Sequence, residues 1–193
     1  MNQKLHIPCM SMRKIAPISG TLIILVCLIS AYAYACTAQE IDTSVDVTLE
    51  RFYKQVEGAR EFAGVAKGMR ALPNVKKAGF IVGGEYGEGA LRVGGKTVDY
   101  YNVAGASFGL QIGAQSKDII IVFMTKEALD QFRAGEGWEA GVDGNIALMK
   151  VGGGERVDST TVKDPIVAFV FDVKGLMADT SLKGAKLTKV NKK

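Results

Sequence analysis

The segment from Lys77 to Met124 places the strongest constraint on the fold, because it alternates short β-branched and aromatic runs with glycine. Five strand candidates follow one another, at residues 78–82, 90–93, 97–103, 107–114 and 118–124. Glycine pairs and the run Ser116-Lys117-Asp118 separate them, and links this short demand antiparallel hairpins. Glycine inside strands permits bulges, tight bends and close approach of backbones. The segment therefore predicts a strongly curved, mostly antiparallel sheet that its glycines bend.

The stretch FIVGGEYGEGALRVGGKT, Phe80 to Thr97, has some features of a nucleotide-binding phosphate loop. Such a loop needs a glycine, four residues, and then Gly-Lys-Ser or Gly-Lys-Thr. Gly95, Lys96 and Thr97 supply the second half, but Ala90 stands where the first glycine is required. The following residues predict a strand, whereas a phosphate loop runs into a helix. We interpret these glycines as structural and expect no nucleotide.

An amphipathic helix is expected before the sheet, with Asp42 and Thr43 as candidate N-caps and Pro73 as its end. Apolar residues recur there at spacings of three and four: Val45, Leu49, Phe52, Val56, Ala59, Ala63 and Ala66. Glycines at 58, 64 and 68 each weaken a helix by about 1 kcal/mol relative to alanine, so a break into two helices stays open. Charges of both signs on the polar face favour packing on the core over insertion into a membrane.

A second helix is expected after the sheet, capped by Thr125 and stopped by Gly135, with Ala128, Leu129 and Phe132 turned inward. Trp138 follows in a glycine-rich connection, residues 145–151 predict a strand, and residues 152–163 predict a polar loop. The most apolar stretch, 165–173, predicts a central strand with residues 177–190 as its companion. The expected fold class is α+β, with an N-terminal helix and one further helix packed on the curved sheet.

The first 35 residues have the pattern of a secretory signal peptide. Lys4, Arg13 and Lys14 precede an apolar run, and a small-residue stretch ends at Ala35. A retained transmembrane anchor is the alternative. We predict a signal peptide at 1–35, a short linker at 36–42 and a single domain at 43–193.

Cleavage after Ala35 would make Cys36 the first residue of the exported chain, where a bacterial lipoprotein carries its acyl groups. Ala33 stands where a leucine is usual and Tyr34 is bulky, so a soluble exported protein is the alternative to a lipoprotein. The predicted location is the periplasm, with Cys36 as the candidate anchor to the outer membrane.

Loss of the signal peptide limits the available chemistry, because His6, Cys9 and Cys27 leave with it. A chain without histidine cannot build a Ser-His-Asp or Cys-His site, and zinc and copper lose their commonest ligand. An enzyme that uses carboxylates alone is the alternative, but Asp and Glu are scattered without a distinctive pair spacing, so we expect no enzyme, metal or cofactor. The signal removes three of the 24 basic residues, which leaves 21 against 20 acidic ones, so nucleic acid is not the expected partner.

The C-terminal end is rich in lysine and carries no acidic residue from Thr180 onward. The lysines in question are Lys183, Lys186, Lys189, Lys192 and Lys193. They predict a contact with anionic lipid head groups or, alternatively, a solvated edge that prevents aggregation. In the second case the helical stripe of Leu49, Phe52 and Val56 becomes the candidate for lipid contact.

Several segments together resemble one known family, the SYLF lipid-binding domains. They are VKKAGFIVGGEYGEGAL at 75–91, YYN at 100–102, SFGLQIGAQS at 107–116, TKEALDQF at 125–132 and DPIVAFVFDVKGLMADTSLKGAKLTK at 164–189. The order matches that of the family from about Ala66 to Lys189. The sequence is most similar to the bacterial branch, whose members are exported single domains and often lipoproteins.

The resemblance implies an α+β domain that associates with phospholipid and has no catalytic residue set. Eukaryotic members bind phosphoinositides or actin, and we do not carry these specificities over. The expected function is a non-catalytic phospholipid-binding domain of the bacterial cell envelope, with anionic head groups favoured. The alternative is a structural or protein-interaction module of the envelope for which lipid contact is incidental.

Overall fold

The computed structural model describes residues 36–135, 137–139, 146–150, 164–175, 182 and 184–192. The predicted signal peptide at 1–35 and loop at 152–163 lie outside these residues, as do Lys183 and Lys193. Residues Cys36–Lys193 form one compact unit. Its elements are α2 (Ala38–Gln55), α3 (Ala59–Val65), β1 (Gly68–Val93), β2 (Lys96–Phe123), α4 (Lys126–Ala134), β3 (Gly137–Glu139), β4 (Ala147–Lys150), β5 (Ile166–Gly175) and β6 (Lys186–Val190).

The N-terminal helix begins earlier than predicted, within the segment assigned to a linker. Thr37 and Glu40 form a capping box, in which the Thr37 side chain accepts from the Glu40 N–H and the Glu40 carboxylate accepts from the Thr37 N–H. These two bonds satisfy donors that a bare helix end leaves open, so α2 starts at Ala38 instead of after Asp42 or Thr43. The predicted break is confirmed, because Gly58 has a φ of 82° and separates α2 from α3.

Pro73 was wrongly predicted to end the helix, and it lies within β1. The strand tolerates proline there because, among the described strands, β1 pairs only with β2, and because its register shifts between Leu72 and Val75. Asn74, with a φ of 47°, completes this bulge and donates its N–H to Asp118 Oδ1 at 2.8 Å.

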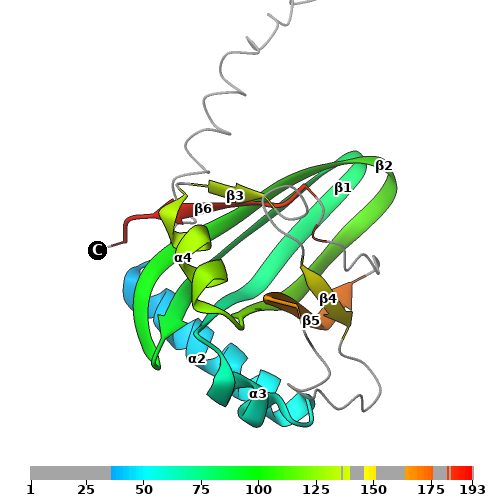
Figure 1. Cartoon of the computed structure of the whole chain (residues 1–193). Coiled ribbons are helices and arrows are strands. Elements are labelled where there is room, and N and C mark those ends of the chain that lie inside the picture. The colour runs from blue at the N-terminus through cyan, green and yellow to red at the C-terminus, as the bar shows by residue number, and fades with distance from the viewer. Residues whose placement is uncertain are drawn as a thin grey trace, which may run out of the picture. The chain divides into compact units, whose positions relative to one another are not determined.

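β1 and β2 form one long antiparallel hairpin, so the prediction of five short strands is wrong (Figure 1). The single turn lies at Gly94 and Gly95, whose φ values of 58° and 78° suit a two-residue hairpin turn that glycine accommodates. Gly95, Lys96 and Thr97 therefore belong to a hairpin and not to a phosphate loop. The other glycine pair, Gly83 and Gly84, lies inside β1 near a shift of register. Glycine occurs at β-bulges as well as at turns, so this pair did not indicate a turn.

The hairpin folds back on itself, and glycines lie where its two layers meet. A Cβ atom on Gly89 would lie 1.9 Å from the Ala71 carbonyl oxygen, and one on Gly87 would lie 2.8 Å from Val75 Cγ2. The contact at Gly89 is with backbone and excludes a side chain, whereas a side chain at Gly87 would require Val75 to shift, so both positions have the structural role predicted for these glycines. Gly84 differs, since a Cβ atom there would meet nothing within 4 Å.

The six-stranded sheet has the order β3-β6-β2-β5-β4, with β1 on β2. All pairings are antiparallel except β4 with β5, as the prediction of a mostly antiparallel sheet required. β5 has neighbours on both edges, which confirms it as a central strand. Two predictions are wrong: β6 pairs with β2 and β3 instead of β5, and Trp138 lies in strand β3.

Two apolar cores lie on the two faces of the sheet, because alternate residues of β2 and β5 point to opposite sides. Ile120, Val122 and Phe169 pack with α2 and α3 on one face. Ile119, Ile121 and Phe123 pack with α4 on the other. α4 itself is as predicted, with Thr125 as its N-cap and Ala128, Leu129 and Phe132 buried. The α+β fold class is confirmed.

Candidate functional site

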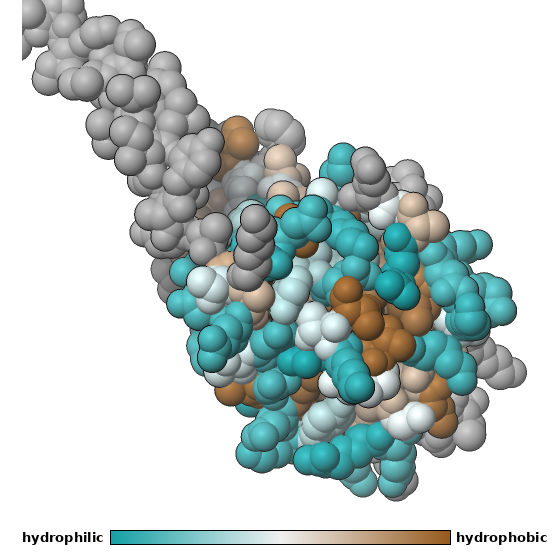
Figure 2. All heavy atoms as spheres, turned by 90° about the vertical axis from the view of Figure 1, so that its left-hand side faces the viewer, coloured by the Kyte–Doolittle hydropathy of each residue, from teal (hydrophilic) through white to brown (hydrophobic). Residues whose placement is uncertain are grey.

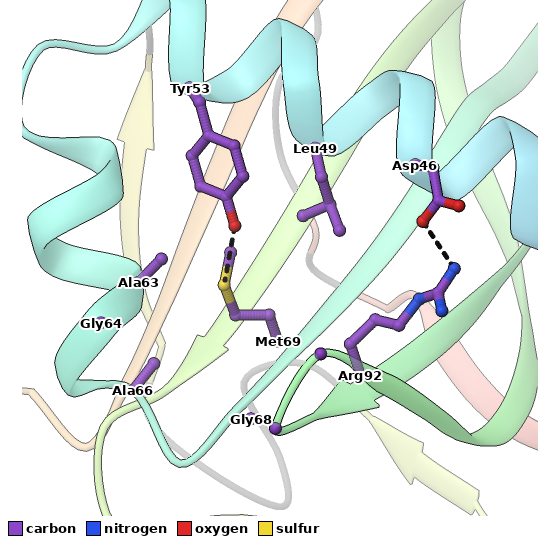
Figure 3. A pocket seen from close by; sticks show the side chains of 11 residues that line it. Asp46, Leu49, Tyr53, Ala63, Gly64, Ala66, Gly68, Met69 and Arg92 are labelled. Atoms are coloured by element: carbon purple, nitrogen blue, oxygen red, sulfur yellow. Dashed lines mark hydrogen bonds and ion pairs between the residues drawn. The ribbon is translucent and has the colours of Figure 1, made fainter.

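A pocket of about 270 Å³ opens between the two N-terminal helices and the end of the hairpin (Figure 3). Its lining residues are Asp46, Leu49, Tyr53, Ala63, Gly64, Ala66, Gly68, Met69, Arg92, Gly94 and Gly95. The three from α2 share one helix face because their spacing is close to the helical period, and they point toward the strand. Small residues keep the opposite wall open: a Cβ atom on Gly64, Gly94 or Gly95 would meet nothing within 4 Å.

Arg92 is the cation at the rim of this pocket. The register shifts between Leu91 and Arg92, and such a bulge changes the direction in which a side chain points. The Arg92 guanidinium lies 2.6 Å from Asp46 Oδ1 and 3.5 Å from Asp42 Oδ1. Asp42 is held by two further donors, the hydroxyls of Thr97 at 2.6 Å and Tyr100 at 2.9 Å. Of the two carboxylates, Asp42 is therefore the more tightly fixed.

Tyr53 contributes a hydroxyl to the apolar part of the pocket. Its O–H donates to the Met69 sulfur at 3.8 Å, and a thioether is only a weak acceptor. The Arg60 guanidinium lies 4.8 Å above the Tyr53 ring. Burial raises the pKa of Tyr53 and outweighs the opposing effect of Arg60, so this hydroxyl remains a donor at neutral pH.

The described C-terminal lysines do not form a free basic patch. Lys189 forms an ion pair with Asp99, which Arg133 also contacts at 3.0 Å, and Lys192 lies 2.8 Å from Glu88. No acidic residue follows Thr180 in the sequence, but the fold brings Asp99 and Glu88 next to Lys189 and Lys192. Lys186 is exposed, and Lys183 and Lys193 lie outside the described residues. Lipid contact by these lysines stays a prediction.

The helical stripe proposed as the other lipid-contacting surface is divided. Phe52 and Val56 have exposed fractions of 0% and 2% and belong to the core beside the sheet. Leu49 is half-buried and lines the pocket. Of the three residues, Leu49 alone faces a space that a ligand can enter in this structure.

Cys36 is exposed, and its backbone is tied to the far end of the chain. Its N–H donates to Glu88 Oε2 at 3.0 Å, and its carbonyl accepts from Lys192 Nζ at 3.0 Å. The Tyr86 hydroxyl donates to the other Glu88 oxygen at 2.8 Å. Burial alone would raise the pKa of Glu88, but the hydrogen bonds from Lys192, Tyr86 and Cys36 lower it. Burial and the bond to Glu88 raise the pKa of Tyr86 to about 12.

A second unusual cation, Arg70, lies away from the pocket in the core. It is fully buried, with its guanidinium 4.7 Å from the Tyr101 ring and 5.5 Å from the Phe132 ring. It donates to the Asn102 carbonyl at 3.1 Å, and among the described residues no carboxylate pairs with it. Burial lowers the pKa of Arg70 to about 9.

Polar residues cover most of the molecular face shown in Figure 2, and a compact apolar area lies among them. Within the part of the chain that the structure describes, no helix has the length and hydropathy needed to cross a membrane. The same residues contain no group of three His, Cys, Asp or Glu side chains placed to hold a metal ion. The pocket beside Arg92 combines apolar side chains, a cation and a hydroxyl, and it is the candidate site that we consider.

The fold and the pocket define an α+β domain with a small amphipathic surface site. Residues 104–193 match the family model described as "Ysc84: Las17-binding protein actin regulator". Over this part the chain is similar to the Ysc84, or SYLF, family, and the match confirms the resemblance for these residues. No curated protein matches the sequence. The match covers most of β2 and all later elements, whereas the pocket residues precede it.

Sequence reasoning missed Asp46, Tyr53, Met69 and Arg92 as members of a site. The first two could have been found, because Asp42, Asp46, Leu49 and Tyr53 recur at spacings of three and four beside the apolar stripe. Arg92 could not, since it pairs with a residue 46 positions away.

Proposed function

We propose that the chain is a non-catalytic phospholipid-binding domain that acts in the bacterial cell envelope. The signal peptide would export it, and Cys36 would either carry acyl groups that hold it at the outer membrane or begin a soluble periplasmic protein. The pocket is the observation that carries the proposal. Apolar walls with a cation and a hydroxyl at fixed points are what an amphiphile with an anionic head requires.

Electrostatic attraction to anionic lipid would add to this site. A basic residue close to an anionic bilayer contributes about 1 kcal/mol, within a Debye length of about 8 Å at physiological salt. Asp99 and Glu88 neutralise Lys189 and Lys192, so the C-terminal edge would contribute less than five free lysines. Lys186 is the described lysine of this group best placed to contribute, because it is exposed and outside these two pairs.

Co-sedimentation of residues 36–193 with vesicles tests the proposal, since both apolar cores lie within this part. Vesicles of phosphatidylcholine alone and the same vesicles with added phosphatidylglycerol supply the two surfaces. We expect binding to the anionic vesicles that weakens as salt is added. Protein that stays in the supernatant with both vesicles at low salt would refute the proposal.

A protein-interaction module is the second candidate, because the family description names a protein-binding actin regulator. The same purified domain, immobilised and exposed to solubilised envelope proteins, discriminates between the two. Stoichiometric capture of one protein, together with no vesicle binding, would favour this candidate.

A further inference from the structure

The pocket is too small for a whole phospholipid. At about 270 Å³ it lies just below the range of about 300–1,000 Å³ that is usual for small-molecule sites. Leu49, Met69 and the methyl groups of Ala63 and Ala66 form the apolar part of its wall, and Asp46, Tyr53 and Arg92 form the polar part. A single hydrocarbon chain fits this shape, and a two-chain lipid would leave most of its apolar surface outside.

Arg92 has the properties of a ligand-binding cation. Its side chain is only 15% exposed, and its Nε atom is buried without a hydrogen-bond acceptor among the described residues. A guanidinium binds carboxylate and phosphate groups through two parallel hydrogen bonds. Asp42, fixed by Thr97 and Tyr100, keeps the guanidinium in place when its other partner changes.

Asp46 occupies the position that a ligand's anionic group would take. Its side chain is 66% exposed, and its described contact is the 2.6 Å ion pair with Arg92 (Figure 3). An exposed ion pair of this kind changes an equilibrium by at most about fivefold, so a buried ligand anion can replace it.

We infer that the pocket binds a single-chain anionic amphiphile, whose carboxylate or phosphate displaces Asp46 from Arg92 while its chain lies against Leu49 and Met69. This inference rests on the proposed function and specifies the ligand class of the same site. A free fatty acid supplies the carboxylate, and a lysophospholipid supplies the phosphate.

Titration calorimetry of residues 36–193 tests the inference with dodecanoate and with a short-chain lysophosphatidylglycerol, each below its micelle concentration. Dodecyl maltoside serves as an uncharged chain of the same length. We expect at least tenfold tighter binding of one or both anionic probes than of the maltoside. The anionic probe that binds identifies the source of the ligand, and equal binding of all three overturns the inference.

Three variants assign the binding to the pocket. Asp46→Asn removes the internal competitor and should tighten binding of the anionic probe by up to about fivefold, whereas Arg92→Gln should weaken it at least tenfold. Gly64→Leu adds a side chain at the pocket wall, where its Cβ atom would meet nothing within 4 Å, and leucine suits a helix better than glycine, so this variant should abolish binding while the domain stays folded. Gly84→Leu is the matched control, because it adds the same side chain in open space on β1.

Weaker binding by Asp46→Asn, or unchanged binding by Gly64→Leu, would overturn the inference whatever Arg92→Gln does to stability. Vesicle sedimentation of the same variants separates it from the proposed function. Vesicle binding that persists in Gly64→Leu, together with no binding of either probe by the parent, refutes the pocket alone. Probe binding with the expected pattern but no vesicle binding refutes the membrane function alone.

Discussion

Gly89→Ala tests whether the contact between the two layers of the hairpin determines the stability of the domain. The added Cβ atom would lie 1.9 Å from the Ala71 carbonyl oxygen, where ordinary contacts begin at 3.4 Å. The two backbones would therefore have to separate by about 1.5 Å, the difference between these distances. Ala71 and its neighbour Leu72 are buried in the cores on opposite faces of the sheet, so the movement disturbs both cores.

The expected loss of stability follows from the nature of the obstacle. Extra atoms in a packed core cost about 1–3 kcal/mol when side chains can yield. Here the obstacle is a backbone carbonyl within a paired strand, so we expect a loss of about 3 kcal/mol. Such a loss lowers the melting temperature of a domain of this size by about 6–12 °C. It also lowers the midpoint of urea unfolding by at least about 1 M.

Urea unfolding of residues 36–193, followed by circular dichroism, measures the change. Gly84→Ala is the control, because its Cβ atom meets nothing within 4 Å, and we expect it to stay within about 0.5 kcal/mol of the parent. The reasoning is refuted if Gly89→Ala has the same midpoint and the same slope as Gly84→Ala.

Three further predictions concern charged groups and the N-terminus. Glu88→Gln should lower the free energy of unfolding at neutral pH. Because hydrogen bonds lower the pKa of Glu88 in the folded state, the difference in stability between variant and parent should shrink as pH falls below about 4.5. A difference that does not change with pH contradicts this prediction. Arg70→Met should raise the free energy of unfolding at pH 7, because it removes a charge buried without a carboxylate partner among the described residues. The folded-state pKa of Arg70 is about 9, below its ordinary value, so the parent protein should become more stable relative to the variant above pH 9. Urea midpoints measured at pH 7 and pH 10 test this. The prediction is contradicted if the variant is no more stable than the parent at pH 7 and the difference between them is no smaller at pH 10. If Cys36 is the membrane anchor, expression of the whole chain in a bacterial host should yield a mass that shows acylated Cys36; an unmodified N-terminal cysteine would exclude the lipoprotein and favour the soluble periplasmic protein.

Local signals in the sequence were sufficient for the elements that local interactions determine. Thr125 and the apolar spacing behind it predict α4, and Gly58 predicts the break between α2 and α3. β5 follows from a continuous apolar run, since a strand covered on both faces has no polar alternation. Pro73 was predicted to end a helix but lies in β1, because its place in a strand depends on a bulge and on an edge position that the sequence does not reveal.

Contacts between distant residues explain what the sequence did not reveal. Gly87 and Gly89 were assigned to bends, but their closest neighbours are Val75 and Ala71 in the other layer of the same strand. The ion pairs of Lys189 and Lys192 likewise depend on β6 lying beside β2, a pairing that no local pattern encodes. The pocket also depends on contacts between distant residues, because Asp46 and Arg92 meet only when α2 packs on the hairpin.

The length of the hairpin also determines the order in which the domain can form. The paired residues next to the turn, Val93 and Lys96, are three positions apart in the sequence, whereas the pair at the other end of the hairpin, Gly68 and Phe123, is 55 positions apart. Because closing a long loop costs more entropy than closing a short one, the ladder extends outward from Gly94 and Gly95 before its layers fold together. A substitution at the turn should therefore slow folding, whereas one at Gly89 should mainly accelerate unfolding.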